Sequence, residues 1–218
     1  MEDNINFMID YDEAKMILEE CDKNIENLDV EKMLNTQHGV YSNYISSLIV
    51  KFVLAYGLKN DTIRKMKITD YDENLNCIII NEYKVRLPDG LAMQMKKYKE
   101  IRKRFLEKYE IESERLFFDN NDVDKKLDNT KMFTVLKKVI GNVQAEEVAK
   151  YAIVQLLQNG VPDYIISDFT GYKKDIMEYC QNIIDKNSGM NLLENQCKIL
   201  DAALIKIGNE YENRSAII

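Results

Sequence analysis

Cationic side chains are concentrated in one segment of the chain, Leu91 to Tyr109. This segment has only two glutamates, and its apolar residues Met95, Tyr98, Ile101 and Phe105 follow helical spacing. The cations are Lys96, Lys97, Lys99, Arg102, Lys103, Arg104 and Lys108. Because lysine and arginine neutralise the charges of a phosphate backbone, we predict a phosphate-facing helix with the first six cations as nucleic-acid ligands. The alternative is that they form the solvated outer face of an amphipathic helix.

The other residue types that often carry chemistry show no pattern of a metal or catalytic site. His38, the only histidine, stands beside Gly39, which favours a surface or turn residue over a ligand or a base. The four cysteines lack CxxC spacing, which predicts reduced thiols in a cytoplasmic protein. The aspartates of residues 119–129 lack the glycine and the closing glutamate of a calcium loop. We therefore predict no metal and no cofactor.

Acidic residues are unevenly distributed in this chain of 218 residues, whose formal net charge is −7. Residues 1–31 hold eleven acidic side chains against two lysines, so the rest of the chain carries a net charge of +2. A near-neutral body is compatible with a basic face. The N-terminus lacks the basic and apolar regions of a secretion signal, and no apolar run approaches the ~18–20 residues that span a bilayer. We predict no membrane partner.

The segment from Glu146 to Tyr179 has the pattern of a helix, a tight turn, a second helix, another turn and a third helix. Asn159-Gly160 ends the first helix, because glycine adopts the left-handed conformation after a helix at little cost. Pro162 begins the second helix, where its missing N–H would have no partner in any case. Gly171 ends the second helix. This segment is the most strongly patterned part of the chain.

Three further helices, and a weaker helical segment with a loop over Asp29 to Asn43, are predicted in the first third of the chain. Tyr11 to Leu28 carries an apolar stripe at helical spacing. Ser42 is the expected N-cap of a strongly apolar helix that Gly57 ends. Either Asn60 or Asp61 is the expected N-cap of the short helix that follows.

Three short segments with strand propensity come next, ITDYD, NCIIIN and YKVRLP. They are separated by DENL and by a tight turn, which predicts a small three-stranded antiparallel sheet that ends at Pro88. With only two prolines and eight glycines, the composition favours long helices over a sandwich or a barrel. The predicted class is α+β and predominantly α.

The sequence LLQNGVPDYIISDFTGY, residues 156–172, resembles the core of the catalytic domain of tyrosine recombinases, the phage integrase family. IDYDEAKMILEEC, from Ile9, resembles the helix that opens that domain. YGLKNDTIRKMKITDYD, from Tyr56, resembles the family signature in which T-G-L-R-x-S-E-L leads into a strand. The resemblance is colinear from about Ile9 to Tyr179. It implies the helical catalytic-domain fold of this family, with its small antiparallel sheet.

The resemblance also implies a domain organisation. Residues 1–8 form a polar lead, 9–185 the integrase catalytic-like domain and 186–218 a C-terminal helical tail, with no separate N-terminal DNA-clamping domain. Apolar or near-apolar residues of the tail recur every 3.5 residues, at Leu193, Cys197, Leu200, Leu204, Ile207 and Tyr211. In recombinases a C-terminal helix docks onto the neighbouring subunit, so the expected partner is a second copy or an active recombinase. Packing in cis is the alternative.

The family's phosphate-binding positions fall on residues of different chemistry in this chain. The first arginine falls on Lys59, which keeps a positive charge but lacks the planar fork that binds two phosphate oxygens. The second arginine falls on Ala149, and its histidine partner falls on Glu146, which would repel phosphate. A shift of the alignment by one residue would place Lys150 at the position of the second arginine.

The remaining catalytic positions fall on Tyr172, Lys84 and Tyr179. Tyr172 takes the place of the turn histidine, Lys84 that of the lysine that protonates the leaving oxygen, and Tyr179 that of the nucleophile, slightly early in the sequence. The resemblance thus implies a recombinase scaffold without most of its chemistry. We predict a non-catalytic protein that binds duplex DNA or associates with an active recombinase. The alternatives are a residual recombinase that uses Tyr179, and a dimeric structural or interaction protein without a nucleic-acid partner.

Overall fold

The computed structural model describes residues 8–36, 38–141, 144–187, 200–201 and 204–205. The chain forms two compact units, Met1–Met177 and Glu178–Ile218. In the predicted tail stripe, Leu200 and Leu204 are described and exposed. The other stripe residues, Leu193, Cys197, Ile207 and Tyr211, lie outside the described residues. Within the described ranges, none of the helices combines the length and the hydrophobicity needed to cross a bilayer.

The first unit is mostly helical, as predicted. Its helices are α1 (Tyr11–Glu26), α2 (Val30–Thr36), α3 (His38–Tyr56), α4 (Asn60–Lys65), α5 (Asp89–Tyr109), α6 (Asn129–Met132), α7 (Thr134–Ile140), α8 (Ala145–Gln158) and α9 (Asp163–Thr170). A 3-10 turn (Ile68–Asp70) and the strands β1 (Tyr71–Asp72), β2 (Cys77–Ile80) and β3 (Tyr83–Arg86) lie between α4 and α5. The helix α10 (Lys174–Asn187) crosses the boundary between the two units.

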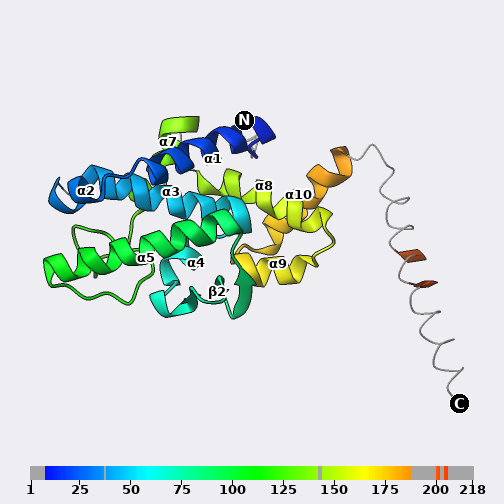
Figure 1. Ribbon diagram of the computed structural model, residues 1–218. Coiled ribbons are helices and arrows are strands. Elements are labelled where there is room, and N and C mark those ends of the chain that lie inside the picture. Colours follow the sequence, from blue (N-terminus) through cyan, green and yellow to red (C-terminus); the bar gives the residue numbers. More distant parts are fainter. Residues whose placement is uncertain (1–7, 37, 142–143, 188–199, 202–203, 206–218) are drawn as a thin grey trace, which may run out of the picture. The chain divides into compact units, whose positions relative to one another are not determined.

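The helix α3 lies at the centre of the first unit and packs against α1, α7 and α8 (Figure 1). Its side chains Leu48 and Phe52 are fully buried, as expected of a helix that is apolar on nearly every side. The helix ends before Gly57, as predicted. It begins at His38, however, so Ser42 lies inside the helix and is not its N-cap.

The helix α1 packs along α3, and its N-terminus is fixed by a capping box at Asp10. The backbone N–H of Glu13 donates to Asp10 Oδ1 at 2.8 Å, and the N–H of Asp10 donates to Glu13 Oε2 at 3.0 Å. Each carboxylate therefore satisfies a backbone donor that has no partner within the helix.

Replacing Asp10 with alanine will lower the free energy of unfolding by about 1 kcal/mol, because the Glu13 N–H loses its acceptor. Urea denaturation monitored by circular dichroism measures the change. Asp12→Ala is the matched control, since Asp12 is also an acidic residue in the first turn of α1. An equal loss in both variants would show that the helix dipole, and not the cap, carries the effect.

The predicted three-stranded antiparallel sheet is confirmed. Its order is β1-β2-β3, and Ile78 pairs with Tyr71 on one side and with Val85 on the other. The hairpin between β2 and β3 turns through Asn81 and Glu82, whose φ angles are 46° and 71°. Positive φ at both central residues matches the right-handed twist of the flanking strands.

The helices on either side of the sheet begin at different residues from those predicted. Lys59 takes the N-cap position of α4 without a side-chain hydrogen bond, so neither Asn60 nor Asp61 is the cap. The helix α5 begins two residues before Leu91, at Asp89. The predicted apolar face of α5 is buried throughout: Met95, Tyr98, Ile101 and Phe105.

The helix pair at the end of the first unit lies where it was predicted to within one residue, since Pro162 is the N-cap of α9 and not its first residue. The helix α8 ends at Gln158, directly before Asn159-Gly160, and α9 begins directly after Pro162 and ends before Gly171. The turn between them and the turn after α9 therefore lie where the glycine and proline spacing placed them.

Candidate functional site

The last turn of α9 is the point where three separate segments of the first unit meet. The backbone N–H of Lys59 donates to the Thr170 carbonyl oxygen at 2.9 Å, and the Thr62 hydroxyl donates to the same oxygen at 3.0 Å. From the β2–β3 hairpin, the side-chain amide of Asn81 donates to the carbonyl oxygens of Asp168 and Phe169, both at 3.0 Å. These bonds satisfy carbonyls that a helix end leaves without partners, and they hold α4 and the hairpin against α9.

Lys59 and Tyr172 are brought together at this junction. The Lys59 ammonium lies 5.9 Å from the centre of the Tyr172 ring, within the range of a cation–π contact. Tyr172 is buried and Lys59 is half-buried. Gly171, between the end of α9 and Tyr172, has φ +82° and no room for a side chain, because an added Cβ would lie 2.5 Å from Thr62 Oγ1.

On α8, Ala149, the residue that the resemblance aligned with the second arginine, lies in packed apolar structure. Ala149 is fully buried. An added Cβ at Gly57 would lie 3.3 Å from the Ala149 carbonyl oxygen and 3.0 Å from Ile153 Cγ1. Gly57, just after the end of α3, therefore packs directly on α8. The backbone at Gly57 and the α8 backbone at Ala149 are in close contact, and Ala149 is buried beside it.

Lys150, the neighbouring cation, is turned into the protein. Its side chain is 1% exposed, and its ammonium lies 2.9 Å from Glu146 Oε1, whose side chain is 46% exposed. The two residues are four apart on one helix face, where opposite charges attract. A phosphate approaching Lys150 would have to compete with this carboxylate.

The other predicted catalytic residues, Lys84 and Tyr179, belong to β3 and α10. Lys84 is exposed on β3, beside Tyr83, whose ring packs edge-on against Phe169 at 5.8 Å between centroids. Tyr179 lies on α10 within the second unit. Among the described residues, no group of three or more histidine, cysteine, aspartate or glutamate side chains is placed to hold a metal ion.

The cations of α5 are largely occupied by contacts with the rest of the first unit. Lys99 lies 3.1 Å from Glu73, Lys103 lies 3.9 Å from Glu107, and Arg104 pairs with Glu31. Lys97 donates to the carbonyl oxygen of Ile25 at 3.3 Å, and Lys108 donates to that of Leu34 at 2.8 Å. Lys97, Arg104 and Lys108 therefore hold α1 and α2 against α5, whereas Lys99 contacts the β1–β2 turn and Lys103 pairs within α5.

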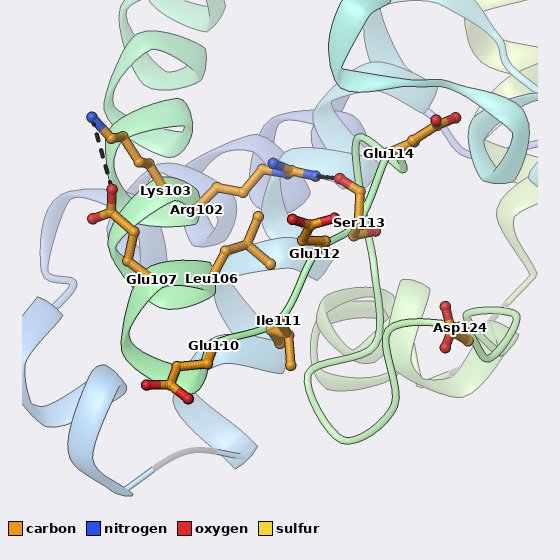
Figure 2. Close-up of a pocket in the computed structure, with 10 residues that line it drawn as sticks. All are labelled: Arg102, Lys103, Leu106, Glu107, Glu110, Ile111, Glu112, Ser113, Glu114 and Asp124. Atoms are coloured by element: carbon orange, nitrogen blue, oxygen red, sulfur yellow. Dashed lines mark hydrogen bonds and ion pairs between the residues drawn. The ribbon is translucent and has the colours of Figure 1, made fainter.

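Arg102 is not on the outer surface of α5. Its side chain is buried, lies over the Phe118 ring and donates to the carbonyl oxygens of Ser113 and Arg115. Figure 2 shows this arginine reaching from α5 toward Ser113, beside the Lys103–Glu107 pair. Arg102 therefore supports the fold from inside the first unit and offers no exposed guanidinium group to DNA.

The C-terminal half of α5 borders an acidic concavity with a volume of about 870 Å³ (Figure 2). Arg102 and Lys103 line it, together with five acidic residues: Glu107, Glu110, Glu112, Glu114 and Asp124. The excess of carboxylates gives this concavity a negative potential, which disfavours a phosphate backbone.

A second concavity, which the sequence analysis did not single out, has the opposite charge. It lies between α4 and the segment 115–127, with a volume of about 380 Å³. Its lining residues are Asp61, Arg64, Lys65, Arg115, Phe117, Lys126 and Leu127. These residues come from two segments separated by fifty positions in the sequence, from Lys65 to Arg115, so no local pattern could have indicated this concavity.

Comparison with solved structures identifies the fold. The crystal structure of XerA recombinase matches 88% of the chain with a TM-score of 0.56 and 13% identity. XerH site-specific recombinase, bound to palindromic difH substrate in a post-cleavage complex, matches 86% with a TM-score of 0.59 and 13% identity. The chain has the fold of a recombinase catalytic domain. It spans 66% of the XerA chain and 54% of the XerH chain.

No protein-family model matches the sequence, and no curated protein matches it. The predicted fold class, a predominantly helical recombinase-like domain with a small antiparallel sheet, is confirmed.

Proposed function

We propose that this protein is an integrase-like protein that binds duplex DNA without cleaving it. The observation that carries the proposal is how two residues of α8, Ala149 and Lys150, are packed and paired. Ala149 is packed against the Gly57 backbone, and the adjacent cation, Lys150, is buried in an ion pair with Glu146. On the alignment given by the resemblance, the position of the second phosphate-binding arginine has no cation that can reach a phosphate without displacing a carboxylate.

The expected consequence for catalysis is large. Cleavage of a phosphodiester builds up negative charge on the phosphate oxygens, and preorganised donors stabilise that charge. Removal of one such donor costs roughly 3–4 kcal/mol in other enzymes, or two to three orders of magnitude in rate. The substitution of Lys59 for the first arginine adds to this, because one ammonium cannot bind two oxygens in a plane.

Binding makes weaker demands than catalysis. Affinity for duplex DNA comes mainly from the release of counterions when lysine and arginine contact phosphates, and it requires no alignment of a nucleophile. XerH is DNA-bound in its solved complex, and a chain with the same fold but degenerate catalytic positions could retain the binding role alone.

Fluorescence anisotropy on a labelled duplex of mixed sequence, over a series of salt concentrations, tests the binding. We expect the logarithm of the affinity to fall linearly with the logarithm of the salt concentration, with a slope of about −0.9 for each phosphate contact. Incubation with a nicked duplex, followed by denaturing electrophoresis, tests the chemistry. We expect no covalent protein–DNA adduct.

Two outcomes would contradict the proposal. An adduct that forms with the parent protein and is lost in Tyr179→Phe would establish a residual recombinase with Tyr179 as the nucleophile. Absence of binding even at low salt would exclude duplex DNA as the partner.

A further inference from the structure

The basic concavity beside α4, lined by Arg64, Lys65, Arg115 and Lys126 with Asp61, is here named the α4 pocket. The apolar side chains Phe117 and Leu127 are buried beneath it. Lys65 is exposed, and the Lys126 side chain is 68% exposed. The side chains of both lysines are therefore accessible from solvent, and the Lys126 ammonium also lies near Asp61.

The two arginines form the wall of the α4 pocket. Arg64, whose side chain is 14% exposed, donates from Nε to the Leu127 carbonyl oxygen at 2.7 Å and also bonds to Asn129. Arg115 donates to the carbonyl oxygens of Asp124, at 3.0 Å, and Lys125. Carbonyl oxygens satisfy the N–H groups but carry no net charge. These carbonyl bonds therefore hold the two guanidinium groups in place without neutralising them, although Arg64 also pairs with the Asp61 carboxylate.

Asp61 is the one carboxylate among the residues that line the α4 pocket. Its Oδ1 lies 3.2 Å from the Lys126 ammonium and 2.9 Å from Arg64 Nη1. These two cations, Lys126 first, hold the pKa of the Asp61 carboxyl below its usual range. Asp61 is thus ionised at neutral pH, and the lining has four cations against one carboxylate.

No comparable excess of positive charge lines the two concavities beside α5. The acidic concavity has two cations against five carboxylates. The third, lined by Glu73, Asn74, Lys96, Lys97 and Glu100, has two of each. Since binding to a phosphate backbone follows the local density of cations, the α4 pocket is the best match among these three.

We infer that the α4 pocket binds a phosphate of the DNA backbone, with Lys65 and Lys126 as the direct ligands. Arg64 and Arg115 supply a fixed positive field behind these lysines, and the negative charge of Asp61 lowers the affinity of the pocket for a phosphate. The inference rests on the proposed DNA binding and gives it a location. That location differs from the α5 cations, of which Lys97, Arg104 and Lys108 contact α1 and α2.

The test compares three double charge reversals by anisotropy on the same duplex. Lys65→Glu/Lys126→Glu changes the α4 pocket, and Lys96→Glu/Lys103→Glu changes α5. Lys23→Glu/Lys137→Glu changes two other exposed lysines and controls for net charge. Loss of two phosphate contacts should weaken binding roughly 50-fold at about 0.1 M salt and make the salt slope shallower by about 1.8. We expect this of the α4 pocket variant alone.

Asp61→Asn provides a measurement that misfolding cannot mimic, because it should strengthen binding. Removing a unit charge about 7 Å from a phosphate in a high-dielectric environment should raise the affinity about threefold. Equal melting curves by circular dichroism confirm that each variant is folded.

The outcomes separate this inference from the proposed function. If the parent protein and the α4 pocket variant bind the duplex equally well, the inference is wrong, and the proposed DNA binding uses another surface. Loss of affinity in the α5 variant alone would move the contact to that helix. If the parent protein does not bind at low salt, both the proposed function and the inference are wrong.

Discussion

Replacing Lys131 with methionine is expected to lower the free energy of unfolding by about 3–5 kcal/mol, the range measured when one partner of a buried ion pair is removed. Asp119 is 3% exposed, and both of its carboxylate oxygens lie 2.6 Å from the Lys131 ammonium. Without Lys131, the carboxylate keeps only the backbone N–H of Asn121, at 3.0 Å, as a described donor. Chemical denaturation of the parent and the variant measures the difference.

A second substitution distinguishes the buried charge from a loss of packing. Asp119→Asn in the Lys131→Met background removes the charge but keeps an oxygen that can accept from the Asn121 N–H. We expect this double variant to regain most of the stability that Lys131→Met loses. If the double variant is as unstable as Lys131→Met, the contribution of Lys131 is its aliphatic chain and not its charge.

The elements of this fold could be predicted where local sequence determines them. Gly160, Pro162 and Gly171 mark helix ends through backbone geometry, and the structure follows them. The prediction of Ser42 as an N-cap was wrong, because an N-cap contributes only about 1 kcal/mol to stability. The preceding residue, Tyr41, is buried in α3 and packs its ring 5.1 Å from that of Phe105. Burial of one aromatic side chain outweighs a cap.

The candidate site could be predicted only in part, because charges are neutralised by residues from distant segments. The run of cations in α5 was evident, but its partners Glu31 and Glu73 belong to other elements. The Glu146–Lys150 pair is the exception, since a spacing of four residues could have indicated it from the sequence. The α4 pocket joins Lys65 to Lys126 through the fold alone.

Gly171→Ala is expected to destabilise the first unit by about 3 kcal/mol, through two separate effects. At φ +82° an alanine is strained, and such strain costs on the order of 1 kcal/mol or more. In addition, its Cβ would lie 2.5 Å from Thr62 Oγ1, which donates to the Thr170 carbonyl oxygen. Moving Thr62 breaks this buried hydrogen bond, at a cost of about 1–3 kcal/mol. Denaturant unfolding measures the sum.

Gly160→Ala separates the two effects, because Gly160 has nearly the same φ, +77°, but nothing within 4 Å of an added Cβ. We expect this variant to show the backbone strain alone, and therefore a clearly smaller loss than Gly171→Ala. Thr62→Ala combined with Gly171→Ala should be less destabilising than the sum of the two single variants, since the clash is absent in that background. If Gly171→Ala and Gly160→Ala lower the free energy of unfolding equally, then Thr62 can move away from the added Cβ without destabilising the contact between α4 and the end of α9. The packing that holds Lys59 beside Tyr172 would then contribute little to stability.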